Sequence, residues 1–109
     1  MDAPIKGRLG ADFTVEQGRQ FAANCMLNVL AVLEAEIGDL NRVKSVVKIL
    51  TFVNSADSFF DQLAVANGGS QLLSDIFGET VGIPPRSAIG VNVLSGNIPV
   101  ETEALLEIQ

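Results

Sequence analysis

The chain has 109 residues, of which 48% are apolar, and its formal net charge is −6. This length fits one compact domain, and so high an apolar fraction predicts apolar surface left over for a subunit interface. With no histidine and a single cysteine, Cys25, the sequence excludes Ser-His-Asp and Cys-His catalysis, histidine-ligated or cysteine-rich metal sites and an intrachain disulfide.

The first predicted element is a long helix over residues 15–37. Residues 1–13 before it show no periodicity and are expected to be an irregular lead-in. Thr14 and Gln17 form a capping box at the helix start, and Gly38 is well placed to end it. An apolar stripe at helical spacing predicts the buried face; it consists of Phe21, Cys25, Val29, Val32 and Leu33.

A strand over 46–54 and a second helix over about 59–77 follow. The strand has apolar residues on both faces, with Ile49 on one and Phe52 on the other, so we expect the sheet to be covered twice. The inner face of the helix is assigned to Leu63, Leu72, Leu73, Ile76 and Phe77. Gly68-Gly69 inside it predicts weak local helix, or else a place where another backbone or a ligand comes close.

The last predicted elements are strands over about 86–94 and 99–108, preceded by the stiff segment Gly82-Ile83-Pro84-Pro85. Residues 95–98 have hairpin-turn character, and a hairpin would place Asn92 opposite Glu101, with Arg86 roughly 20 Å farther along. The resulting order of elements predicts an α+β fold with both helices on one face of the sheet. A neighbouring subunit is expected to cover the other face.

Other features of the sequence narrow its partners and location. The Lys and Arg residues are scattered, and an acidic chain repels phosphates, so we expect no nucleic-acid partner. No glycine-rich nucleotide loop is present, and we expect no cofactor. No run approaches the ~20 apolar residues that span a bilayer, and the first residues lack a secretory signal core. These features predict a cytoplasmic protein without a membrane partner.

Two motifs near the end of the chain carry a family resemblance. Pro84-Pro85-Arg86-Ser87-Ala88 and Val100-Glu101-Thr102-Glu103-Ala104 resemble the P-x-R-S and E-x-E-A strands of the RidA (YjgF, L-PSP endoribonuclease-like) family, with the same spacing between arginine and glutamate. Thr51-Phe52-Val53 is similar to the family's central strand. Gly7-Arg8-Leu9-Gly10-Ala11-Asp12 and Asn54-Ser55-Ala56 resemble a distant bacterial subgroup.

The resemblance implies a chorismate-mutase-like fold with a mixed, antiparallel-rich sheet and a homotrimer with clefts between subunits. It also implies hydrolytic deamination of reactive 2-imino (enamine) acids. Arg86 would bind the substrate carboxylate and Glu101 would position or activate water, with Ser87, Phe52 and Asn92 as candidate ligand contacts.

Some features depart from the family pattern. Family members begin with a strand pair that carries a tyrosine, whereas this chain has no tyrosine, so residues 1–109 are expected to form one domain that is short at its N-terminus. Ala88 replaces a cysteine that many members carry, and Asn67 is only an approximate match to an asparagine of the second helix.

Arg86 is planar and always charged, and can grip a carboxylate with two parallel N–H groups. Glu101 is a plausible general base, and we expect any site that joins the two to lie between subunits. The simpler alternatives are a surface arginine, a solvated glutamate, a structural Ser87, a core Phe52, turn support by Asn92 and packing of Cys25.

The sequence therefore indicates three candidate functions. The first is a 2-imino acid deaminase, and the second is an inactive or regulatory trimer that binds a small carboxylate. The third is an endoribonuclease, against which the acidic balance and missing histidine argue.

Overall fold

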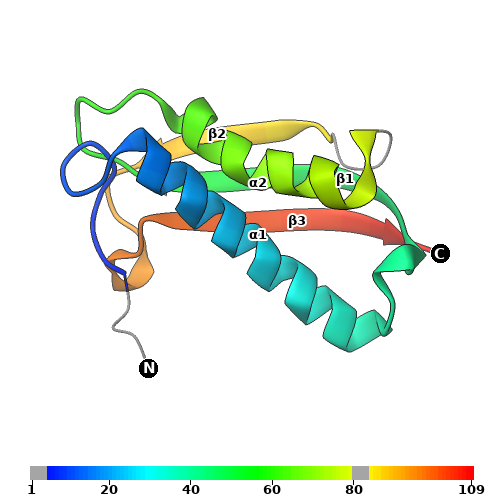
Figure 1. Ribbon diagram of the computed structural model, residues 1–109. Coiled ribbons are helices and arrows are strands. Elements are labelled where there is room, and N and C mark those ends of the chain that lie inside the picture. Colours follow the sequence, from blue (N-terminus) through cyan, green and yellow to red (C-terminus); the bar gives the residue numbers. More distant parts are fainter. Residues whose placement is uncertain (1–4, 80–83) are drawn as a thin grey trace.

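A computed structural model describes residues 5–79 and 84–109 of the chain. In order, it contains helix α1 (Val15–Ile37), a 3-10 turn η1 (Leu40–Arg42), strand β1 (Val43–Asn54), helix α2 (Gln62–Phe77), strand β2 (Arg86–Val91), a 3-10 turn η2 (Ser95–Asn97) and strand β3 (Val100–Ile108). Figure 1 shows α1 and α2 packed side by side over one face of the sheet. The predicted α+β fold with two helices on one face is confirmed.

The predicted start and end of α1 are both present. The hydroxyl of Thr14 accepts the backbone N–H of Gln17, and the Gln17 side chain accepts the backbone N–H of Thr14. Gly38 ends the helix with a positive φ of 84°, a conformation that glycine adopts without steric penalty. The predicted stripe is displaced by one position, because the fully buried residues of α1 are Gly18, Ala22, Met26 and Leu30. Val32 is 68% exposed.

The glycine pair in α2 does not break the helix. A Cβ on Gly68 would overlap the backbone carbonyl of Arg19 in α1, and one on Gly69 would lie 3.3 Å from the carbonyl oxygen of Ala22. The glycines therefore permit close contact between the two helices, which was the less favoured of the two interpretations. This contact turns α2 so that Val65, Ala66, Gly69 and Leu73 are buried. The assignment of Leu63 and Ile76 to the inner face was wrong, since they are 60% and 45% exposed.

The sheet has the strand order β2-β1-β3, with β1 in the centre. β1 pairs with β2 in parallel and with β3 in an antiparallel ladder. The predicted hairpin between the last two strands was therefore wrong: they lie on opposite sides of β1. The connection between them passes the end of β1, where Gly96 and Asn97 take positive φ values of 68° and 56°. The turn residues at 95–98 were predicted correctly, but they belong to a connection that crosses the end of β1 and not to a hairpin.

Asn54, at the end of β1, holds this crossing in place. Its side-chain Nδ2 donates to the backbone oxygens of Gly7 and Ile98 and to Oδ1 of Asn97. The lead-in before α1 also docks here, because the N–H of Leu9 donates to the carbonyl of Asn54. Leu9 is 0% exposed. The expectation of an irregular lead-in missed this contact, which makes residues 7–9 part of the core.

The core lies between the helices and the sheet in two adjoining clusters. One is formed by Met26, Leu30, Val43, Val46, Ile49 and Leu73, and the other by Leu9, Ala22, Val53, Val65 and Val100. The opposite face of the sheet carries exposed apolar side chains, among them Ile89 (42% exposed) and Leu105 (61%). Within the described ranges, no helix is both long enough and apolar enough to cross a membrane.

Several element boundaries differ from those predicted. β1 begins at Val43 rather than residue 46, α2 at Gln62 rather than 59, and β2 ends at Val91 rather than 94. Residues 56–61 form a turn, in which the N–H of Phe59 donates to the carbonyl of Ala56, and this turn delays the helix. Of the predicted stiff segment before β2, Gly82 and Ile83 lie outside the described residues.

Candidate functional site

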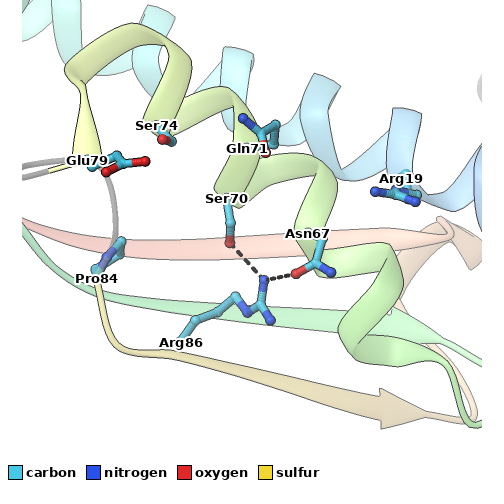
Figure 2. A pocket seen from close by; sticks show the side chains of 8 residues that line it. All are labelled: Arg19, Asn67, Ser70, Gln71, Ser74, Glu79, Pro84 and Arg86. Atoms are coloured by element: carbon cyan, nitrogen blue, oxygen red, sulfur yellow. Dashed lines mark hydrogen bonds between the residues drawn. The ribbon is translucent and has the colours of Figure 1, made fainter.

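Arg86 is the first residue of β2 and lies directly after Pro84-Pro85. Its Cα partner in the parallel ladder is Ile49, which is buried under the helices. Since neighbouring residues in a sheet share a face, the Arg86 side chain projects towards α2. There its Nη1 donates to Oδ1 of Asn67 at 2.7 Å and to Oγ of Ser70 at 2.9 Å (Figure 2).

These two bonds use both hydrogens of Nη1 and fix the plane of the guanidinium. An arginine side chain has five N–H donors in a rigid fork, so Nε and Nη2 keep three. Among the described residues, no hydrogen bond is made by Nε or Nη2 of Arg86, and no carboxylate lies within 4.0 Å of this side chain. The edge formed by Nε and Nη2 therefore presents two parallel donors, the arrangement that matches a carboxylate.

The pocket next to Arg86 is lined by one polar stripe of α2. The stripe consists of Asn67, Ser70, Gln71 and Ser74, spaced i, i+3, i+4 and i+7, which is one face of a helix. The cavity has a volume of about 580 Å³, and Arg19, Glu79 and Pro84 complete its described wall (Figure 2). Its size is within the range of small-molecule sites, although its lining is more polar than most.

Three other predicted site residues lie on the opposite face of the sheet. Ser87 follows Arg86 directly, so its side chain alternates to the uncovered face, where it is exposed. Phe52 pairs with both Ile89 and Glu101 across the sheet, and is half-buried on that same face. One chain therefore brings Phe52 and Glu101 together but separates them from Arg86.

Asn92 and Glu101 do not face each other as the hairpin prediction required. Asn92 follows the end of β2 and lines a shallow depression with Phe59 and Phe60, whereas Glu101 is on β3, beyond the central strand. The pairing of Asn92 with Glu101 was wrong because β1 lies between their strands. Arg86 and Glu101 are at opposite edges and on opposite faces of the sheet, so they cannot share a site within one chain.

Glu101 and Cys25 both line a shallow depression at the edge of the sheet that β3 forms. The pKa of the Cys25 thiol is raised, first by burial and second by the negative charge of Glu101. The thiol donates to the carbonyl of Val100 at 3.4 Å. A raised pKa keeps the thiol protonated and unreactive, which agrees with the interpretation of Cys25 as a packing residue.

Comparison with known proteins identifies the family. Residues 3–98 match the family described as "YjgF/chorismate mutase-like, putative endoribonuclease". The chain belongs to this family. The resemblance drawn from the 84–88 and 100–104 motifs is thereby confirmed.

Relatives support this assignment and show how much of a family member the chain spans. Protein TCP17 of Trypanosoma cruzi is 48% identical over 104 residues, which is 95% of this chain but 65% of that protein. A crystal structure of Atu1372 from Agrobacterium tumefaciens, a protein of unknown function, has a TM-score of 0.93 and 36% identity, and it covers 96% of this chain and 67% of that one. An endoribonuclease-labelled structure from Shewanella oneidensis has a TM-score of 0.90 and 29% identity, over 94% and 68% of the two chains.

Sequence reasoning identified only part of the pocket of this YjgF-family chain. Arg86 came from the paired motifs. Asn67 was noted as an approximate match to a family asparagine but was not assigned to the site, although its Oδ1 accepts a hydrogen bond from Arg86. Ser70 and Ser74 were missed, although their spacing from Asn67 was a usable signal. Arg19 was also missed, because only the crossing of α1 and α2 at Gly68 shows that it borders the pocket. Among residues 5–79 and 84–109, no three His, Cys, Asp or Glu side chains are grouped to hold a metal ion.

Proposed function

We propose that this protein is a hydrolytic deaminase of 2-imino acids and their enamine tautomers, with Arg86 as the group that binds the substrate carboxylate. The observation that carries the proposal is the free Nε–Nη2 edge of Arg86 at the wall of a polar cavity. Among the described residues this guanidinium has no carboxylate partner, and its two acceptors are neutral, so its full charge is available for a ligand. Membership of the YjgF family supports the same assignment.

The hydrogen bonds to Asn67 and Ser70 explain how the chain would hold its substrate. A free arginine side chain loses considerable rotamer entropy when it binds, whereas Arg86 is already fixed at Nη1. With the carboxylate on the Nε–Nη2 edge, the adjacent 2-imino carbon would lie inside the cavity. Orienting the reacting carbon in this way is a recognised source of rate enhancement.

The hydrolysis itself needs one water and a proton relay. Water adds to the 2-carbon of the protonated imine, and a base removes a proton from that water. The tetrahedral intermediate then transfers a proton to nitrogen and expels ammonia, leaving a 2-oxo acid. Glu101 is our candidate base. Because it cannot reach Arg86 within one chain, the proposal requires Glu101 of a neighbouring copy.

Assembly into a homotrimer is part of this proposal, and the uncovered face of the sheet supports it. This face presents Ile89 and Leu105, which are 42% and 61% exposed. Exposed apolar residues gathered on one side of a sheet favour burial against another surface. Arg86 lies on edge strand β2 and Glu101 on edge strand β3, so both are placed where a second copy can approach.

The test couples the purified protein to a dehydratase that releases 2-aminoacrylate and follows the appearance of the 2-oxo acid. We expect the wild type to accelerate its release and Arg86→Ala to lose the acceleration. Arg86→Lys should recover little of it, because lysine cannot form the paired contact. Losing a hydrogen-bonded charge pair costs about 2–5 kcal/mol, or at least about thirtyfold in rate. Lys44→Ala, on an exposed residue remote from the pocket, is the matched control.

Two other outcomes would replace the proposal. If the wild type gives no acceleration but pyruvate still raises its melting temperature through Arg86, the protein is a carboxylate-binding trimer without turnover. If it cleaves RNA, and the cleavage is lost in Arg86→Ala but not in Lys44→Ala, the ribonuclease label of the family applies to this chain. RNA cleavage that persists in Arg86→Ala and separates from the protein on further purification is contamination.

A further inference from the structure

The composition of the pocket wall discriminates between classes of 2-imino acid. Of the described residues that line it, Pro84 is the one apolar side chain. A branched aliphatic substrate would remove water from the amide and hydroxyl groups of α2 without replacing their hydrogen bonds, and each buried polar group left unpaired costs about 1–3 kcal/mol. The wall therefore favours a substrate whose own side chain is polar.

Arg19 adds a second positive charge at the pocket. Its backbone packs against Gly68, next to Asn67, and a Cβ on Gly68 would lie 2.7 Å from the carbonyl carbon of Arg19. The absence of a side chain at residue 68 is thus what brings Arg19 to the pocket. Figure 2 shows Asn67 between Arg86 and Arg19.

Arg19 is available for a ligand. Its Nη1 is 3.7 Å from a carboxylate oxygen of Glu16, and the two side chains are 47% and 76% exposed. Exposed ion pairs of this kind contribute about 0–1 kcal/mol, so a ligand carboxylate can compete with Glu16. A ligand with two carboxylates would satisfy both guanidinium groups of the pocket.

We infer that the pocket is selective for dicarboxylic 2-imino acids, with Arg86 on the 1-carboxylate and Arg19 as the specificity-determining residue for the side-chain carboxylate. The inference rests on the proposed function, since it takes Arg86 as the carboxylate clamp. It adds the substrate class and a role for Arg19. Asn67, which accepts a hydrogen bond from Arg86, would hold the guanidinium that binds the 1-carboxylate.

Calorimetric binding of two stable 2-oxo acids of similar length tests this. The probes are 2-oxoglutarate, with two carboxylates, and 4-methyl-2-oxopentanoate, with one carboxylate and an aliphatic branch. We expect the wild type to bind 2-oxoglutarate at least tenfold more tightly. Arg19→Gln should reduce this preference to less than about threefold, mainly by weakening 2-oxoglutarate binding. Glu16→Gln, which removes the competing carboxylate and keeps Arg19, should retain the preference.

The other outcomes separate this inference from the proposed function. Equal or tighter binding of the aliphatic acid, lost in Arg86→Ala, overturns the dicarboxylate selectivity and leaves the Arg86 clamp intact. A preference that survives in Arg19→Gln overturns the role of Arg19. If neither probe binds to the wild type, both the clamp and the selectivity are wrong.

Discussion

The contact between Gly68 and Arg19 makes the substitution Gly68→Ala a direct test of how the pocket is built. Gly68 lies inside α2, where alanine is normally the better residue by about 1 kcal/mol. Helix propensity alone therefore predicts stabilisation. The structure predicts the opposite, because the new Cβ would overlap the carbonyl oxygen of Arg19 and lie 2.7 Å and 2.9 Å from its carbonyl carbon and Cα.

The expected loss of folding stability depends on which atoms the new Cβ would contact. These atoms are backbone in the middle of α1, so they cannot move aside as the end of a side chain would. Overpacking of this kind costs about 1–3 kcal/mol, occasionally more, and a rigid obstacle puts the cost at the upper end. After the propensity gain, the net loss is about 2 kcal/mol. At about 4–8 °C per kcal/mol for a domain near this size, the melting temperature should fall by roughly 8–16 °C.

Gly69→Ala provides a matched control one residue away. Its Cβ would lie 3.3 Å from the carbonyl oxygen of Ala22 and 3.5 Å from the side chain of Met26, so a small adjustment accommodates it. With the same propensity gain, its stability should stay within about 1 kcal/mol of the wild type. Thermal and urea unfolding of both variants, followed by circular dichroism at equal protein concentration, measures the difference. If Gly68→Ala is as stable as Gly69→Ala, the close crossing of α1 and α2 is wrong, and with it the position of Arg19.

Three further predictions concern other parts of the chain. Asn54→Asp should lower the urea midpoint, because a carboxylate would replace the amide that donates to three oxygens. This repulsion raises the folded-state pKa of the new Asp, so the loss relative to wild type should shrink as pH falls from neutral towards about 4, the ordinary value of an unfolded Asp. An unchanged midpoint would contradict the anchoring role. Cys25 should react with a thiol reagent far more slowly in the folded than in the unfolded protein, and Glu101→Gln, which lowers the folded-state pKa of the thiol, should speed the reaction at pH 9. Because burial and Glu101 raise that pKa, the contribution of Cys25 to stability is complete below the unfolded-state pKa and declines as pH rises through the folded-state value. Leu105→Glu, on the uncovered sheet face, should dissociate the proposed trimer into single chains in analytical ultracentrifugation. Leu63→Glu, on an equally exposed residue of α2, should leave it assembled. A trimer in both variants would place the interface elsewhere.

The sequence predicted the elements better than their arrangement. Capping residues such as Thr14 act within one turn of helix, so local sequence determines where α1 begins. The alternation in β1 likewise identified a strand with two apolar faces. The hairpin failed because turn residues such as Gly96-Asn97 describe the local backbone and not which strand lies next to it. Pairing with β1 is set by long-range contacts, including the anchoring of the turn by Asn54.

In the candidate site, too, local patterns were predicted from the sequence and long-range contacts were not. Arg86 was identified because its motif is contiguous in sequence, whereas Asn67 was only noted as an approximate match to a family asparagine. The two meet because residue 86 pairs with the buried Ile49 and so faces α2, a register that no local pattern encodes. Ser87, adjacent in sequence, was grouped with Arg86 although strand alternation points it to the opposite face. Applying the alternation rule to the motif would have separated them.

The central claim is that the Nε–Nη2 edge of Arg86 binds the carboxylate of a small organic acid. A crystal structure of the protein soaked with 2-oxobutanoate tests it most directly. We predict both carboxylate oxygens at about 2.7–2.9 Å from Nε and Nη2 of Arg86, with Nη1 still bonded to Asn67 and Ser70. A cavity that stays without ligand at saturating concentration, or an acid bound with the Arg86 guanidinium turned away from it, would contradict the claim.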